Sequence, residues 1–340
     1  MIIPFILLCF LISSCSQDPP LEIPFQGLSY PSNFPPPVQI MTDNPVTREG
    51  FELGRTLFYD PILSRNNTIS CGSCHIQTSA FTHHGHDLSH GIDDLLGKRN
   101  ALPIQNLLWQ SSFFWDGGVY HIDMIPLNPI ENPVELDESL SGVLQKLKQS
   151  SRYPALFQKA FGSPEINTTR FLQALSQFQA MLISANSRYD RYVRGEGEVF
   201  TEQEKQGLLL FKQKCGTCHA TDLFSDFQFR NNGLNSEFSL DSGRYAISLH
   251  PDDIGKFKVP SLRNIAKTSP YMHNGQLRTL DQVLDHYRSG VKASATLDPL
   301  LMQNGVPGLN ITDEEKQKII AFLLTLTDDR FIRDPRFSEQ

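Results

Sequence analysis

Two short cysteine–histidine segments carry the clearest chemistry in this sequence. CGSCH occupies residues 71–75 and CGTCH occupies residues 215–219. In a CxxCH segment the two thiols can add to the two vinyl groups of a haem as thioethers, while the adjoining imidazole binds the iron. The sequence therefore predicts two covalently attached c-type haems, the first held by Cys71, Cys74 and His75 and the second by Cys215, Cys218 and His219.

Paired CxxC motifs also bind zinc, so the four thiolates could instead form one tetrahedral metal site. The histidine directly after each pair, the long separation of the pairs and the similar sequences before them favour haem. A haem bound by one histidine can carry electrons or react with peroxide, depending on what occupies its other face. The second axial ligands therefore decide the function.

The N-terminus predicts export, which covalent haem attachment requires. Residues 1–14 form an apolar run that is too short to span a bilayer and is typical of a signal peptide. The sequence ISSC at positions 12–15 resembles the lipobox of bacterial lipoproteins, so we expect a periplasmic protein anchored by a lipid on Cys15; a plain signal is the alternative. Since Cys9 lies in the removed segment, no cysteine remains for a disulfide.

Length and charge bound the remaining possibilities. The chain has 340 residues, of which 39% are hydrophobic and 20% charged, enough for two domain-sized cores. A net charge of −7 without a long basic run argues against nucleic acid as a partner. An acidic protein of this kind is better suited to bind a basic redox protein as its partner. No stretch after the signal could span a membrane, so we expect membrane contact only through the lipid.

A local duplication divides the chain. The pattern Gly-x-x-Leu-Phe begins at Gly54 and again at Gly207, each time upstream of a CxxCH segment. Such a repeat predicts two domains of the same kind. Before the first domain, the Pro-rich sequence after Cys15 is typical of an extended tether. The expected division is a signal peptide at 1–14, a tether at 15–45, an N-terminal haem domain at 46–195 and a C-terminal haem domain at 196–340.

Capping residues and apolar spacing predict helices around both motifs. A short helix should begin at Thr47 and end before Asp60, and apolar spacing indicates helices over 139–149 and 168–185. Three capping boxes begin further helices, at Thr201/Glu204, Thr279/Gln282 and Thr312/Glu315. Convincing alternating strands are absent. The expected fold is mostly α, with two cytochrome c-like haem domains, long loops, and haems at the domain cores and interface.

Several blocks, in order along the chain, resemble the bacterial di-haem cytochrome c peroxidase family, which includes the MauG-type enzymes. They are GRTLFYDPILSRNNTISCGSCH, KRNALPIQN, FFWDGG, PIENPVEL, GLLLFKQKCGTCH, DDIGKFKVPSLRNIAKTSPYMHNG and TLDQVLDHY. The resemblance runs from about Thr47 to the last helix. It implies that the N-terminal haem reacts with peroxide and that the C-terminal haem stores or relays an electron.

Two residues between the motifs match functional positions of the family. Trp115 corresponds to the tryptophan between the haems, and Glu135 to the carboxylate of the peroxide pocket. A carboxyl group there could carry a proton from one peroxide oxygen to the other before the O–O bond breaks. Without the resemblance, Trp115 would be interpreted as a core aromatic residue and Glu135 as a solvated loop residue.

The resemblance also implies a calcium ion between the haems. In the family the ion is bound by one asparagine side chain, two backbone carbonyls and waters, and such oxygen ligands suit this cation. The matching positions are Asn100, Thr268 and Pro270.

The distal ligand of the first haem is left open by the sequence. Some members of the family have a histidine there, and the segment 81–90 offers four, namely His83, His84, His86 and His90. His90 falls nearest the expected place. However, the spacing to Arg99 is longer than usual, and the residues around His90 align better with members that have an apolar residue there. The alternative is a solvated, His-rich loop with incidental metal affinity.

The second haem departs from the commonest pattern. Tyr287 in TLDQVLDHY occupies the position of the methionine ligand of many members and of the axial tyrosine of the MauG type. A phenolate ligand favours ferric and higher oxidation states, whereas methionine raises the reduction potential. Met272 is the competing ligand. The Gln and Arg usual around FWDGG are also replaced, by Ile125 and Gly118.

The resemblance therefore implies a peroxidase that reduces hydrogen peroxide with electrons from a small cytochrome c or cupredoxin, in a family that is often homodimeric. One alternative is a MauG-like oxidase that acts on a protein or organic substrate through a high-valent iron state. The tyrosine at position 287 favours this alternative. The other is a non-catalytic di-haem cytochrome for electron transfer or redox sensing.

Overall fold

The computed structural model describes residues 25–340, so the predicted signal peptide and Cys15 lie outside the described residues. Its helices are α1 (Arg48–Tyr59), α2 (Cys71–Cys74), α3 (Leu127–Glu131), α4 (Leu140–Gln149), α5 (Tyr153–Phe161), α6 (Thr168–Ala180), α7 (Arg188–Val193), α8 (Glu202–Lys214), α9 (Tyr245–Ser248), α10 (Leu280–Asp285) and α11 (Asp313–Leu324). Within this part of the chain no helix is long and apolar enough to cross a membrane.

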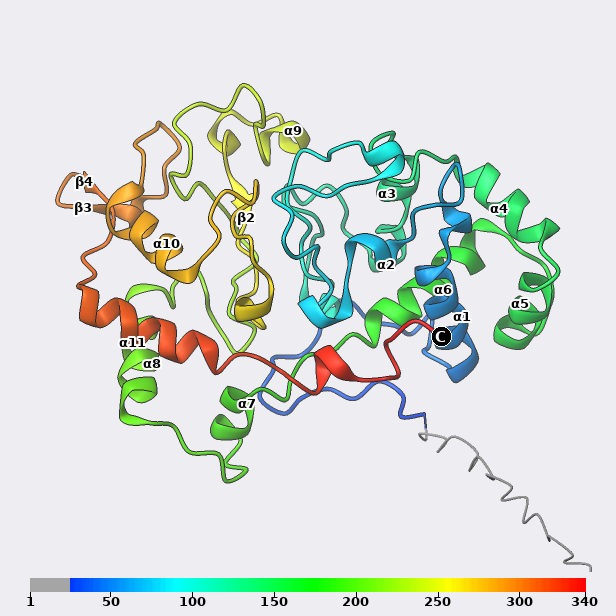
Figure 1. The fold of residues 1–340 in the computed structure, drawn as a ribbon, viewed down its shortest axis with the longest axis horizontal. Coiled ribbons are helices and arrows are strands. Elements are labelled where there is room, and N and C mark those ends of the chain that lie inside the picture. Colours follow the sequence, from blue (N-terminus) through cyan, green and yellow to red (C-terminus); the bar gives the residue numbers. More distant parts are fainter. Residues whose placement is uncertain (1–24) are drawn as a thin grey trace, which may run out of the picture.

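Strands make up little of the fold. The strands of residues 25–340 are β1 (Phe229–Arg230), β2 (Phe257–Lys258), β3 (Met302–Gln303) and β4 (Val306–Pro307), and they form two antiparallel pairs, β1–β2 and β3–β4. Long loops connect the helices (Figure 1). The prediction of a mostly helical fold is therefore confirmed.

The predicted helix starts are confirmed. Thr47 caps α1, and the capping boxes at Thr201, Thr279 and Thr312 begin α8, α10 and α11, with each threonine side chain accepting a bond from the backbone N–H three residues on. Helix ends were harder to predict. α6 ends at Ala180 rather than near residue 185, and the helix after Thr279 changes into a π-helical turn over His286–Gly290.

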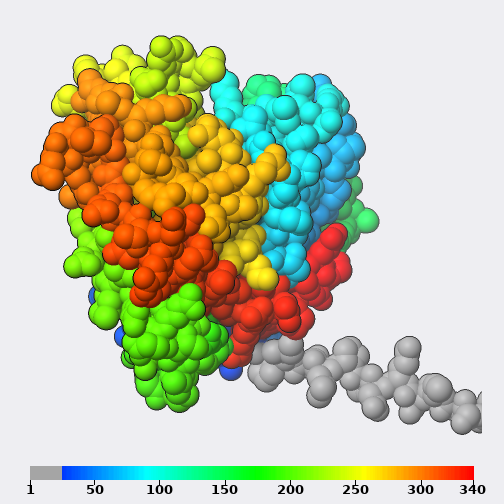
Figure 2. All heavy atoms as spheres, turned by 60° about the vertical axis from the view of Figure 1, so that its left-hand side comes forward, coloured from blue at the N-terminus to red at the C-terminus, as the bar shows by residue number. Residues whose placement is uncertain are grey.

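The described chain has two main hydrophobic cores. One is built around α1, α4, α5 and α6 and contains Phe58 and Phe178, and the other lies between α8 and α11 and contains Phe211 and Phe322. The two sets of helices lie at opposite sides of the molecule in Figure 1. The C-terminal segment returns to the first core, where Phe337 is buried, and in Figure 2 this red segment lies against the blue and cyan half.

Residues 25–45 are packed on the body of the protein rather than extended away from it. Phe34 is buried in a third cluster with its ring 5.1 Å from that of Trp109, edge to face. The Trp109 indole N–H donates to the carbonyl oxygen of Pro35 at 2.6 Å. The expected tether over 15–45 is therefore corrected for these residues, because a Pro-rich segment can still bury aromatic and methionine anchors such as Phe34 and Met41.

The sequence duplication corresponds to a repeated helix crossing. A Cβ atom on Gly54 of α1 would lie 1.9 Å from the carbonyl oxygen of Ala174 and 2.9 Å from Cβ of Phe178, both in α6. On Gly207 of α8 it would lie 2.0 Å from the carbonyl oxygen of Lys318 and 3.0 Å from Cβ of Phe322, both in α11. In each half, glycine thus lets the helix before a CxxCH segment touch the backbone of a later helix.

We expect Gly207→Ala to lower the free energy of unfolding by roughly 1–3 kcal/mol, because the added methyl group must push α8 away from α11. Urea unfolding of the haem-loaded protein would measure the change. Gly27→Ala is the matched control, since nothing lies within 4 Å of a Cβ at that position. Equal stability of the two variants would contradict the close helix crossing.

Candidate haem and peroxide site

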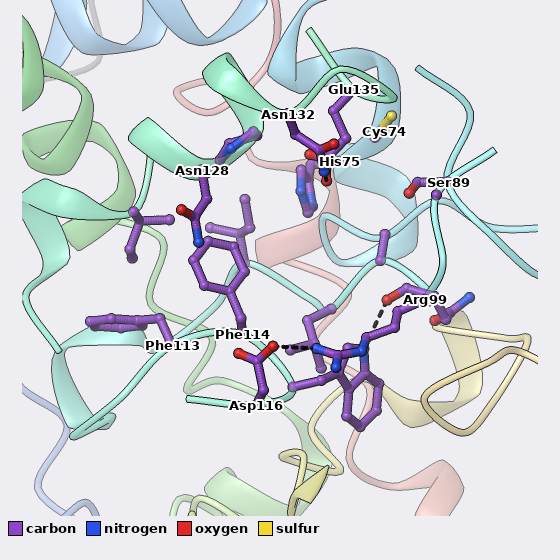
Figure 3. A pocket seen from close by; sticks show the side chains of 18 of the residues that line it. Cys74, His75, Ser89, Arg99, Phe113, Phe114, Asp116, Asn128, Asn132 and Glu135 are labelled. Carbon is purple, nitrogen blue, oxygen red and sulfur yellow. Dashed lines mark hydrogen bonds and ion pairs between the residues drawn. The ribbon is translucent and has the colours of Figure 1, made fainter. Parts of the chain in front are cut away.

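A cavity of about 870 Å³ lies between the two halves of the chain. Its walls come from α2, the loops over 89–116 and 125–136, and the segments 239–246 and 258–261. The volume is within the range of pockets that enclose large organic ligands. Figure 3 shows His75, Cys74 and Glu135 in one part of the cavity, and Arg99 and Asp116 in another.

The first CxxCH segment presents its reactive groups to this cavity. Cys71 and Cys74 begin and end α2, and His75 follows as its C-cap. The Nδ1 atom of His75 lies 2.7 Å from the carbonyl oxygen of Phe81, so Nδ1 carries the proton and Nε2 keeps its lone pair for a metal. Burial lowers the pKa of His75, which keeps the imidazole neutral.

The second CxxCH segment repeats this arrangement. The Nδ1 atom of His219 lies 2.9 Å from the carbonyl oxygen of Phe224, which again leaves Nε2 free to bind iron. Burial also lowers the pKa of His219 and raises that of Cys215 to about 12. All four motif cysteines are partly exposed and unbonded to one another. Both segments therefore fit covalent haem attachment with a neutral histidine as ligand.

The zinc alternative finds no support in the structure. Across residues 25–340 no group of three or more His, Cys, Asp or Glu side chains is arranged to hold a metal ion. Cys71 packs against the first hydrophobic core and Cys215 against the second. The two thiol pairs therefore do not converge on one site.

Glu135 lies in the cavity close to the first cysteine pair. Burial raises the pKa of the Glu135 carboxyl, and the amide of Asn132, which donates to Oε1 at 2.8 Å, offsets part of that rise. Glu135 is also close enough to affect Cys74. The pKa of the Cys74 thiol is raised to about 11, mainly by burial and secondly by the Glu135 charge. A carboxyl group that is easily protonated thus shares a cavity with an imidazole that can bind iron.

Trp115 lies where the two halves of the chain meet. Its indole N–H donates to the carbonyl oxygen of Asn100 at 2.8 Å, and its own carbonyl oxygen accepts from the Lys258 amide at 2.7 Å. The ring of His273 from the C-terminal half lies 6.4 Å away, edge to face. Burial lowers the pKa of His273 to about 4, so this neighbour is uncharged.

Three charged residues that the sequence did not single out also line the cavity. Arg99 donates to Asp116 at 2.6 Å and, through two nitrogen atoms, to Asp241 at 2.7 Å. The pair with Asp241 joins the two halves of the chain. The only sequence signal was that Arg99 and Asp116 stand in blocks that resemble the family, while Asp241 lies between blocks.

Tyr287 and Met272 both approach Asn232. The Asn232 amide donates to the sulfur of Met272 at 3.3 Å. Burial raises the pKa of Tyr287 to about 12, a hydrogen bond with Asn232 acts against the rise, and the Cys215 and Cys218 thiols add to it. Tyr287 therefore lies near the second CxxCH segment, in the π-helical turn after α10. Both residues stay predicted ligands of the second haem.

The His-rich loop turns its rings toward one another. The rings of His83 and His86 stack at 4.4 Å and that of His90 meets His86 at 4.6 Å. Nδ1 of His90 lies 2.6 Å from the Asp94 carboxylate. The cavity wall contains the residues on either side of His90, Ser89 and Gly91, but not His90. This arrangement gives no support to the prediction of His90 as an iron ligand.

The predicted calcium ligands Asn100 and Thr268 have different hydrogen-bond partners and do not bond to each other. The Asn100 amide donates to the carbonyl oxygens of His86 at 3.3 Å and Asp87 at 3.1 Å. Thr268 bonds within its own turn, to Ile265 at 3.3 Å. No hydrogen bond among the described residues links Asn100 with Thr268 or Pro270, so the calcium ion stays a prediction.

Known proteins resemble this chain over most of its length. A family model described as di-haem cytochrome c peroxidase matches residues 48–198. The methylamine utilization protein MauG of Methylorubrum extorquens is 34% identical over 83% of this chain and 79% of its own. The cytochrome c551 peroxidase of Nitrosomonas europaea is 30% identical over 86% and 84%.

A solved structure agrees with these matches. The crystal structure of a MauG-like protein associated with microbial copper homeostasis has a TM-score of 0.83 at 34% identity, with 92% of this chain and 99% of that chain covered. Fold, site and matches thus define an oxidoreductase with two c-type haems. The chain belongs to the di-haem cytochrome c peroxidase family. This confirms the predicted family and the prediction of an enzyme.

Proposed function

We propose that this protein reduces hydrogen peroxide to two molecules of water, using two protons and two electrons from a small c-type cytochrome or cupredoxin. The observation that carries the proposal is the partly buried Glu135 carboxyl in the same cavity as Cys71, Cys74 and His75. When bound, the two haems supply the iron that takes up peroxide and the centres that accept electrons.

In the proposed reaction Glu135 moves one proton. Its carboxylate accepts the proton of the peroxide oxygen that approaches the site, and then returns that proton to the oxygen that leaves as water. The raised pKa favours both transfers near neutral pH, because a carboxylate with an ordinary pKa is a weaker base. Asn132 holds the carboxylate in place through its bond to Oε1.

We assign electron transfer between the halves of the chain to Trp115. Its ring is buried, lines the cavity and lies beside residues from the C-terminal half, which supports this role. Cys215, Cys218 and His219 would hold the haem at which electrons from the donor enter. Mixing the haem-loaded protein with reduced cytochrome c and hydrogen peroxide tests the whole proposal: peroxide-dependent oxidation supports it, and oxidation at the uncatalysed rate contradicts it.

The second candidate is an oxidase of the MauG type, which acts on a protein or organic substrate. The position of Tyr287 near Cys215 and Cys218 favours it, because a phenolate ligand stabilises high oxidation states of iron. A peroxide-oxidised form that persists for minutes in the presence of reduced cytochrome c would distinguish this oxidase from the peroxidase.

If Tyr287 binds the second haem iron, we expect Tyr287→Phe to change the EPR and absorption spectra of that haem and to leave the first haem unaltered. Met272→Leu is the matched control and should leave both spectra as they are. Spectra of six-coordinate His/Met iron in the unaltered protein, lost in Met272→Leu, would contradict the Tyr287 assignment.

Other features of the sequence complete the proposal. We place the protein in the periplasm, anchored through Cys15, with an N-terminal peroxide-reacting domain up to residue 195 and an electron-accepting domain from residue 196. A calcium ion at Asn100, Thr268 and Pro270, and a homodimer, are also proposed by resemblance to the family. Radiolabelled palmitate incorporation that is lost in Cys15→Ser would test the anchor.

A further inference from the structure

Lys258 places a buried amine in the cavity wall. It ends β2, and only 3% of its surface is exposed. β2 pairs with β1, and the Lys258 amide donates to the carbonyl oxygen of Trp115, so the backbone is fixed on two sides. The side chain lines the same cavity as His75 and Glu135.

The amine has uncharged partners only. Nζ donates to Oε1 of Gln110 at 2.7 Å and to the carbonyl oxygen of Ser112 at 2.6 Å. An ammonium group has three N–H donors, so one is left over. Among residues 25–340 no carboxylate forms an ion pair with Lys258; Asp116 acts on it from a longer distance and is itself bonded to Arg99. A buried ammonium without an anion is strongly unfavourable.

The other cationic side chains that line the cavity do not need a further anionic partner. Lys98 is exposed to solvent, and Arg99 is paired with Asp116 and Asp241. Lys258 is thus the cavity-lining cation, within the described residues, that is both buried and without a carboxylate. Burial accordingly lowers the pKa of Lys258 to about 7.

We propose that the Lys258 ammonium binds a propionate carboxylate of the first haem. The proposal rests on the proposed attachment of that haem at Cys71, Cys74 and His75. Each haem carries two propionates, which are anionic at neutral pH. A propionate would accept the remaining N–H of Lys258 in a charge-assisted bond, and each charge would offset the desolvation of the other. The pairing makes Lys258 a positioning residue that also raises the reduction potential of the first haem, since a nearby positive charge disfavours ferric iron.

Potentiometric titration of three variants of the haem-loaded protein tests the proposal. At the wild-type midpoint potential of the first haem, we expect Lys258→Met and Lys258→Gln to raise the ferric-to-ferrous ratio about tenfold. A change of this size is the effect on the ferric/ferrous equilibrium of removing one positive charge that acts at an effective dielectric constant near 20. Lys258→Arg keeps the charge and should leave the ratio near one. Because glutamine keeps N–H donors for Gln110 and Ser112, a merely structural role would be rescued by Lys258→Gln.

Lys256→Met is the matched control, since it removes a positive charge two residues away that faces Asp253 at 3.5 Å. It should leave the potential of the first haem unchanged. A wild-type potential in Lys258→Gln, or an equal shift in Lys256→Met, would overturn the proposal. A separate measurement tests the attachment of the first haem. The double variant Cys71→Ser/Cys74→Ser should contain one haem per chain in the pyridine haemochrome assay, and two haems per chain would refute attachment at these cysteines.

Discussion

Replacing Glu135 by glutamine should slow peroxide reduction by about 10²–10⁴-fold, the range found for the loss of a general acid–base group. Glutamine keeps the size of the side chain and can still bond to Asn132, but it cannot accept and return a proton. Stopped-flow measurement of the reaction of the haem-loaded variant with peroxide would give the rate. The potentials and haem content should stay as in the wild type.

The pH profile adds a second signature of Glu135. The carboxylate form is the active one, so the rate should fall as the pH drops through the pKa of Glu135, which burial places above that of an ordinary glutamate. This acid limb should disappear in Glu135→Gln. Glu138→Gln is the control on the same segment, because Glu138 pairs with Lys146 at 2.6 Å and does not line the cavity. Wild-type turnover in Glu135→Gln would contradict the proton-transfer role.

The second large effect concerns stability. Asp190→Asn should lower the free energy of unfolding by about 3–5 kcal/mol, because it leaves the fully buried Arg263 guanidinium without its carboxylate. Arg263 donates to both Asp190 oxygen atoms at 2.6 and 2.8 Å and to the carbonyl oxygen of Ser184. It also donates to the carbonyl oxygen of Asp222 at 2.8 Å, so it ties α7 to the loop after the second CxxCH segment. Urea unfolding of the haem-loaded protein measures the loss.

The same pair predicts a pH dependence of stability. Burial alone would raise the pKa of Asp190, but the bonds from Arg263 outweigh it and hold the pKa below its usual value. A depressed pKa contributes stability that is present above the unfolded pKa of about 3.9 and is lost as the pH falls through the folded pKa. The variant should therefore lose less stability on acidification than the wild type. Asp87→Asn, which breaks the exposed pair with Arg278, should cost under about 1 kcal/mol.

Local signals made much of the fold predictable. Capping boxes such as Thr201/Glu204 act within a few residues, so the sequence alone located the start of α8. The repeated Gly-x-x-Leu-Phe pattern was visible in the sequence, but its reason was not. The partners of Gly54 and Gly207 are backbone atoms of helices more than 100 residues later in the chain, and only the tertiary structure brings them together.

The residues of the candidate site were also predictable only in part. The spacing of CxxCH predicts its own chemistry, whereas Glu135 and Trp115 were predicted only through the resemblance, because nothing local distinguishes them from ordinary loop and core residues. Lys258 was missed. It stands between Phe257 and Val259, where a lysine in an apolar run is a signal of a buried charge, but the absence of a partner carboxylate could be recognised only from the packing.

Addition of one equivalent of hydrogen peroxide to the haem-loaded protein, followed by absorption and EPR spectroscopy, tests the central claim most directly. We expect both haem spectra to change with the uptake of two oxidising equivalents. Reduced cytochrome c should restore them, with two molecules oxidised per peroxide. Haems that are both six-coordinate and unaffected by peroxide would contradict the claim and indicate a cytochrome that only carries electrons.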